Sequence, residues 1–170
     1  MPVHDLSGAN KGGQAGNTPQ GATPVLTQDV HFLKPEDLSS VLDGKAQPLG
    51  LIGITIGPDT DLDQLAPFVD RLAVIAIEFP AFKDGRGFSQ ARLLRDRFNY
   101  TGDIRAVGDL LTDQIQFLVR VGFSSVDLPE TVSQAAVQSA LERFTVVFQS
   151  AADSRNPVQR LRQSISRAGA

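Results

Sequence analysis

Short apolar runs alternate with amphipathic segments along the chain, and this order constrains the fold more than any other feature. Runs at residues 49–56, 73–79, 103–107 and 124–128 are each followed by apolar residues at helical spacing. Such runs are typical of strands in a parallel sheet, and the spacing in the segments between them predicts helices. The chain is therefore predicted to be an α/β protein with four consecutive βα units.

Two architectures satisfy this order, because the connection between neighbouring parallel strands is right-handed. One is an open parallel sheet, and the other is half of an eight-stranded βα barrel. A half barrel exposes two sheet edges, so it predicts a homodimer. Ahead of the first unit, residues 30–33 are compatible with an added strand and residues 35–42 with a short helix.

Helices are expected in all four crossovers. The first begins within residues 59–63 and carries Leu62, Leu65, Val69 and Leu72 on one face. The second spans residues 89–98, the third presents Leu111, Ile115 and Leu118 and ends at Gly122, and the fourth runs through residues 129–144.

Length and composition predict one domain with two tails. Residues 1–27 are rich in Gly, Asn, Gln, Thr and Pro and are predicted to be a disordered tail, and residues 28–150 form the single α/β domain. Residues 151–170 carry four arginines against one aspartate and form a basic tail. The rest of the chain is acidic, which argues against nucleic-acid binding. Because no apolar run approaches the roughly 20 residues that span a bilayer, we expect a cytoplasmic protein without a membrane partner.

The residue types present exclude several kinds of chemistry. The chain has no cysteine, which removes disulfides, iron–sulfur ligation and thiolate nucleophiles. Its two histidines precede the first predicted βα unit, so no metal site is expected. Neither a nicotinamide-binding fingerprint nor a Walker loop is present, and the sequence names no cofactor. Flavin binding through barrel loops leaves no compact signature and stays open.

Residues 84–89 join the end of a predicted strand, two glycines and the start of a helix. Gly85 and Gly87 allow a positive φ or a close backbone approach to a ligand, and Ser89 is expected to cap the helix. Guanidinium groups beside a helix N-terminus bind oxyanions and phosphates. The predicted ligand-binding residues are Asp84, Gly85, Arg86, Gly87, Ser89, Arg92 and Arg105.

The same composition is equally compatible with an Arg–Asp network that only fixes a loop. Asp84 and Asp109 are the candidates for a catalytic acid or base, although a helix N-cap is the favoured role of Asp109. Arg105 lies within the third predicted strand, so its side chain either faces a ligand cavity or pairs with Glu78 on the neighbouring strand.

Three segments resemble a known family. They read IAIEFPAFKDGRGFSQARLLRDR at residues 75–97, GDIRAVGD at 102–109 and DQIQFLVRVGF at 113–123. They are similar to a proteobacterial family named domain of unknown function nine-three-four, and the resemblance extends over about residues 49–153. One departure lies at residues 124–127, where members commonly carry Asp-x-Phe-Glu. Of that acidic pair, only Asp127 is present here.

The resemblance implies a metabolic role. Members of the family are typically encoded beside the haemoprotein component of assimilatory sulfite reductase and are often labelled oxidoreductases. This implies a role in sulfate assimilation and cysteine biosynthesis. Since the catalytic set is missing, we expect an accessory protein that acts with sulfite reductase. The alternative is a small α/β enzyme, an oxidoreductase by its label, that binds an anionic or phosphate-bearing ligand at residues 84–89.

Overall fold

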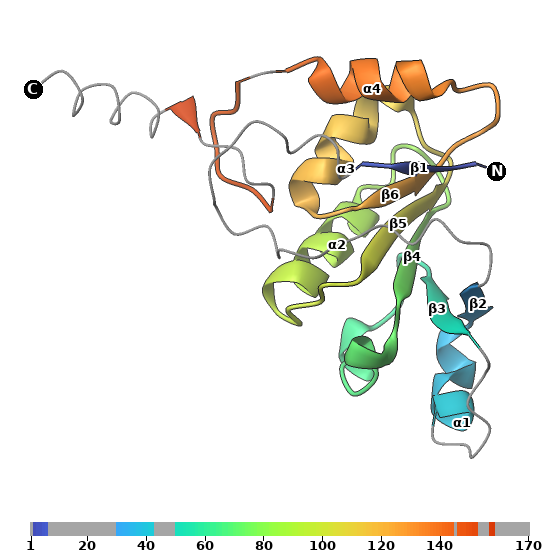
Figure 1. Cartoon of the computed structure of the whole chain (residues 1–170). Helices are drawn as coiled ribbons and strands as arrows, with labels where there is room; N and C mark the ends of the chain where they lie inside the picture. Colours follow the sequence, from blue (N-terminus) through green and yellow to red (C-terminus); the bar gives the residue numbers. More distant parts are fainter. Residues whose placement is uncertain (1, 7–29, 43–49, 145, 153–156, 159–170) are drawn as a thin grey trace, which may run out of the picture.

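One six-stranded sheet organises the protein (Figure 1), in the order β1-β6-β5-β4-β3-β2. The computed structural model describes residues 2–6, 30–42, 50–144, 146–152 and 157–158. Strands β2 to β6 are parallel and neighbour one another in chain order, whereas β1 pairs antiparallel with β6. The strands are β1 (Val3–Asp5), β2 (Val30–Leu33), β3 (Leu51–Ile56), β4 (Val74–Phe79), β5 (Asp103–Gly108) and β6 (Ser125–Asp127).

The helices pack on one face of this sheet. Alternate strand residues such as Ile54, Ile75 and Ile104 point to that face and join a single core cluster with Leu94 and Leu118 from helices. Each such buried side chain stabilises the fold by about 1.5–3 kcal/mol. Among the described residues, the α-helices are α1 (Leu38–Leu42), α2 (Arg86–Asp96), α3 (Ile115–Val121) and α4 (Gln134–Glu142), and the 3-10 helices are Pro35–Asp37, Leu62–Gln64, Val69–Arg71 and Thr112–Gln114.

The mixed α/β class is confirmed, but the first crossover differs from its prediction. An α-helix was expected after β3, and the structure has two 3-10 helices there, Leu62–Gln64 and Val69–Arg71. Pro67 lies between them; it has no backbone N–H and disfavours α conformation in the residue before it. The predicted apolar residues Leu62, Leu65 and Val69 are still buried, so the pattern identified the core face without the correct helix type.

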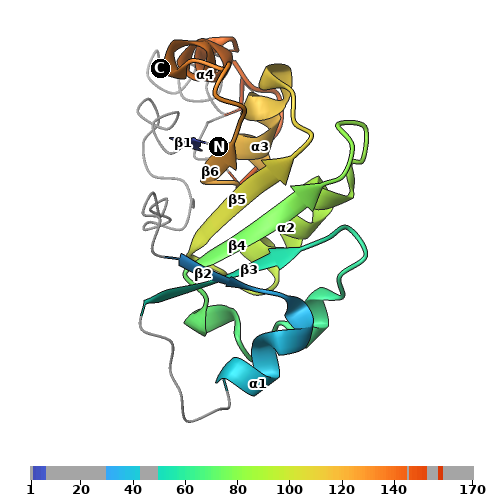
Figure 2. The same ribbon diagram turned by 90° about the vertical axis from the view of Figure 1, so that its right-hand side faces the viewer.

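The C-terminal ends of the parallel strands lie together at one end of the sheet, where the loops leading to the helices begin (Figure 2). The face away from the helices carries Gly53, Ala76, Arg105 and Ser125, which occupy alternate positions to the core residues. The added strand at residues 30–33 and the short helical segment at 35–42 are confirmed as β2 and as a 3-10 turn followed by α1.

The N-terminal boundary of the domain differs from the prediction. Residues 3–5, assigned to a disordered tail, form β1, and the adjacent Leu6 is 1% exposed in the core. Three residues have too little local pattern to predict a strand; pairing with β6 gives them their structure. The remainder of the N-terminal tail and most of the basic C-terminal tail lie outside the described residues.

Candidate functional site

The loop between β4 and α2 and the first turn of α2 hold most of the predicted ligand-binding residues. The Arg86 guanidinium donates to the Asp84 carboxylate through Nε at 3.0 Å and Nη2 at 2.7 Å. Its Nη1 donates to Asp59, in the loop after β3. One cation therefore lies between two carboxylates, and the three residues join two neighbouring loops.

These contacts already satisfy the charges of the cluster. The side-chain hydrogen bond from Arg86 lowers the pKa of Asp84, and the same bond raises the pKa of Arg86. A carboxylate with a lowered pKa is a weaker base, so Asp84 is poorly suited to abstract a proton. A guanidinium paired with two carboxylates carries no uncompensated charge to attract an anion.

The two glycines of this loop have a structural reason for their identity. Gly85 precedes α2 with φ −82°, and Gly87 lies inside the helix, so neither adopts the positive φ that the sequence allows. A Cβ on Gly87 would lie 2.7 Å from Phe79 Cζ and 3.1 Å from Ile77 Cγ2. Glycine at 87 therefore lets α2 pack closely against β4. The group that approaches its backbone is the core ring of Phe79 rather than a ligand.

Ser89 does not cap the helix as predicted. Helix α2 begins three residues earlier, at Arg86, whose backbone N–H donates to Asp84 Oδ1 at 3.2 Å. Ser89 therefore lies within the first turn of the helix, where it cannot act as the N-cap. Ser89 is an exposed residue of α2 and lines a hollow of about 330 Å³ between the helix and residues 58–63. Arg97 and Asp63, also in this lining, form an ion pair of 2.9 Å.

The structure places Arg92 and Arg105 away from residues 84–89. Arg92 pairs with Asp96 one turn further along α2. Arg105 projects from β5 on the face away from the helices, where Nη2 donates to Asp103 at 3.0 Å and Nε donates to Ser125 at 3.2 Å. The predicted set therefore does not converge on one ligand position.

Arg105 belongs to a buried polar network. Asp103 is fully buried, and its carboxylate also accepts hydrogen bonds from the hydroxyls of Ser124 and Ser125 at 2.9 and 2.8 Å. The Arg105 guanidinium lies 5.9 Å from the ring centroid of Phe32. A buried carboxylate is tolerated only when it is paired and hydrogen-bonded, and this network meets both conditions.

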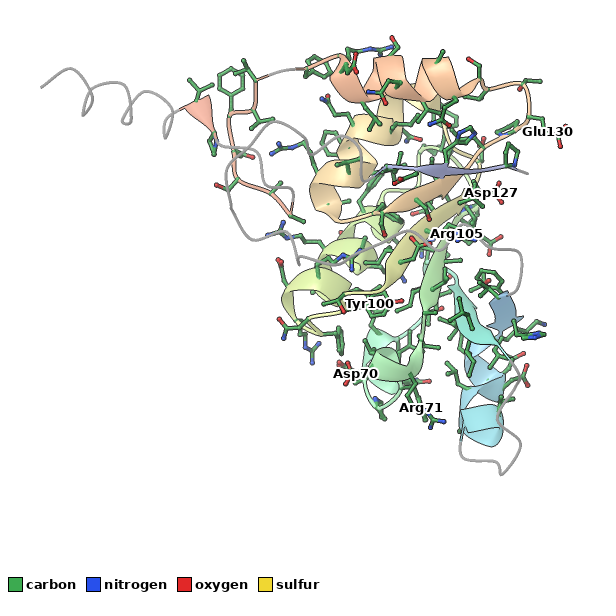
Figure 3. The ribbon with its side chains drawn as sticks, viewed as in Figure 1. Asp70, Arg71, Tyr100, Arg105, Asp127 and Glu130 are labelled. Atoms are coloured by element: carbon green, nitrogen blue, oxygen red, sulfur yellow. The ribbon has the colours of Figure 1, made fainter. Side chains whose placement is uncertain are left out.

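Asp127 ends β6 beside β1, opposite Val3 (Figure 3). It is half-buried, and its Oδ1 has no hydrogen-bond partner among the residues described. Burial raises its pKa, while the positive charge of Arg105 opposes that effect. Because the pKa of Asp84 is lowered and that of Asp127 is raised, Asp127 is the stronger base of the two.

Asp109 joins two loops and does not cap a helix as predicted. Its Oδ2 accepts a hydrogen bond from the Phe82 backbone N at 3.1 Å, and the residue that precedes the 3-10 helix before α3 is Leu111. Gln114 Nε2 donates to the Phe82 carbonyl at 2.8 Å, and Gln114 Oε1 accepts from Leu111 N at 3.1 Å. Phe82 is therefore held through both its N–H and its carbonyl.

Sequence reasoning missed an apolar surface beside these loops. It consists of Phe82, Leu111 and Phe117, which are 50%, 44% and 65% exposed, and the half-buried Phe88; we call these four residues the aromatic surface. Leu111, predicted to belong to the apolar spacing of the third helix, precedes the 3-10 helix Thr112–Gln114 and is exposed. The sequence signal for this surface was Phe117. It is apolar, but it does not share the spacing of Ile115 and Leu118, the residues that mark the core face of α3.

Within residues 2–6, 30–42, 50–144, 146–152 and 157–158, no three His, Asp or Glu side chains gather in a way that could hold a metal ion. None of the helices described is long and apolar enough to cross a membrane.

The fold defines the class of protein: an α/β protein with a mostly parallel sheet whose helices cover one face. A family model described as a bacterial protein of unknown function (DUF934) matches residues 53–159, more than half of the chain. The chain belongs to the DUF934 family, as its motifs predicted. No curated protein matches it.

Proposed function

We propose that this protein is a non-catalytic accessory protein of assimilatory sulfite reduction, in cysteine biosynthesis, and that it acts in the cytoplasm by binding sulfite reductase. The observation that carries the proposal is the pairing of Arg86 with both Asp84 and Asp59. This pairing takes up the cation on which an anion-binding enzyme would depend. The neighbouring loops present exposed apolar side chains, which suit protein binding better than chemistry.

The two predicted acid–base residues, Asp84 and Asp109, have structural partners that support the same conclusion. Asp84 is hydrogen-bonded to Arg86, which lowers its pKa, and Asp109 accepts the backbone N–H of Phe82. A general base must have a free lone pair within reach of the substrate and a pKa near the working pH. Asp84 fails the second condition, and Asp109 is engaged in holding a loop.

Binding of the two proteins tests the proposal directly. The full chain is immobilised, and the purified haemoprotein component of assimilatory sulfite reductase from the same genome is passed over it. We expect saturable binding that an excess of free chain competes away. Absence of binding at concentrations of tens of micromolar would count against the accessory role, and sulfite or phosphate binding to the chain alone would favour the small anion-binding enzyme instead.

A homodimer remains part of the proposal. The consecutive order of β2 to β6 is compatible with half of a βα barrel, and within the described sheet β1 and β2 each have one paired neighbour. A second copy that pairs with such an edge would shield its free backbone groups. Sedimentation is expected to give twice the chain mass of 18.2 kDa, and a monomer at micromolar concentration would remove the dimer.

A further inference from the structure

We propose that the aromatic surface is where this protein docks, and that its partner is a protein surface with an apolar centre and a basic rim. The inference rests on the proposed function, because it says which part of the chain makes the contact. The four residues of the surface come from two loops and two helices at the end of β4 and β5 where these strands meet their crossovers.

The backbone of the two loops that carry Phe82 and Leu111 is held by hydrogen bonds before any partner binds. Phe82 is held at its N–H by Asp109 and at its carbonyl by Gln114, and Gln114 also accepts the N–H of Leu111. Phe117 follows Gln114 by three residues, so the two side chains share one side of the helical segment. Binding a fixed loop costs less conformational entropy than binding a mobile one.

A line of aromatic rings connects the surface to the core. Phe117 contacts Phe88 with ring centroids 6.0 Å apart, Phe88 contacts Phe79 at 5.1 Å, and Phe79 contacts Phe123 at 5.9 Å. Phe79 and Phe123 are 1% and 4% exposed. An exposed Phe117 that rests on buried rings has the properties of an interface hot spot, a large and rigid side chain on a packed base.

The charges around the aromatic surface indicate what kind of partner it binds. The loops that carry and flank it contain four carboxylates, Asp59, Asp84, Asp109 and Asp113, against the two cations Lys83 and Arg86. A partner with basic residues around an apolar patch complements this rim. A second copy binding through the same patch would place carboxylates opposite carboxylates, since a two-fold interface brings each patch against itself.

Three variants test the docking surface on the full chain. The dissociation constant for the purified sulfite reductase haemoprotein is measured for wild type, Phe82→Ala, Phe117→Ala and the control Leu93→Ala. Leu93 is 45% exposed but lies on the side of α2 that lines the hollow with Pro58. We expect each Phe variant to weaken binding by about tenfold to a hundredfold and Leu93→Ala to change it less than about twofold. Circular dichroism verifies that each variant is folded.

The charge of the rim is tested through the association rate. Asp113→Lys is expected to slow association with the haemoprotein, and added salt to slow association of the wild type. If the haemoprotein binds the wild type and both Phe variants equally well, the docking surface is wrong while the accessory role stands. If it does not bind wild type at all, the accessory role itself fails. If Phe117→Ala instead dissociates a homodimer, the occupant is a second copy and the inference is overturned.

Discussion

Gly108 gives the sharpest test of how the loops beside the aromatic surface are built. It ends β5 with φ +104°, a conformation that side chains other than glycine rarely adopt. A Cβ added there would lie 2.4 Å from the backbone oxygen of Phe79. That oxygen accepts the N–H of Asp109 at 2.8 Å, so backbone movement that relieved the contact would disturb this bond.

The cost of Gly108→Ala follows from these two terms. The strained φ contributes about 1–3 kcal/mol, and forcing a methyl group against fixed backbone contributes about 1–3 kcal/mol more. A gain of about 0.4–1 kcal/mol from restricting the unfolded chain offsets part of this. The net loss in the free energy of unfolding is therefore about 1–6 kcal/mol.

Urea denaturation of the full chain measures this loss, with Gly85→Ala as the matched control. Gly85 has φ −82°, and nothing lies within 4 Å of a Cβ placed on it. Its substitution is expected to leave stability unchanged or to raise it by about 0.4–1 kcal/mol. Equal stability of Gly108→Ala and wild type would refute the reasoning, as would a large loss in Gly85→Ala.

Three further variants probe the charges. Arg86→Ala breaks an exposed cluster, so we expect only a small decrease in melting temperature. We also expect haemoprotein binding at least as tight as that of the wild type, because the rim becomes more acidic, and weakened binding would contradict the charge argument. Asp103→Asn breaks the buried ion pair with Arg105, and we expect a loss of about 3–5 kcal/mol in urea denaturation, with a loss below about 1 kcal/mol contradicting the network. Asp127 has its pKa raised by burial from the ordinary 3.8, so the folded state binds its proton more tightly and stability falls as pH rises from about 4 through the folded pKa. Asp127→Asn should therefore raise the melting temperature at pH 7 but not at pH 3, and the opposite pH trend would contradict this sign.

Strand positions and the core face followed from local sequence pattern. The run predicted as a strand at residues 73–79 begins one residue before β4 and ends with it. Gly122 ends α3 with φ +113°, as its position predicted. A buried strand and a glycine C-cap each depend on residues close in sequence, which is why these elements could be predicted. Pro67 could have corrected the first crossover, since it interrupts the apolar spacing between Leu65 and Val69.

The loop contacts depend on residues far apart in sequence, and pattern alone could not supply them. The partner of Arg86 at position 59 lies 27 residues away, and the contact between Asp109 and Phe82 also spans 27 residues. Gly87 illustrates the same limit. In the sequence, a glycine near a helix start indicates a ligand site, whereas in the structure it makes room for the Phe79 ring. The sequence identified residues 84–89 as an unusual segment. The structure shows that tight packing and ion pairs within the protein require these residue types.

Growth of a deletion strain on sulfate, sulfite or sulfide as the sole sulfur source tests the proposed role most directly. The proposed function predicts growth on sulfide and failure on sulfate and sulfite, with rescue by wild type and by Arg86→Ala but not by a folded Phe82→Ala, Phe117→Ala double variant. Normal growth of the deletion strain on all three sulfur sources would contradict a role in sulfite reduction.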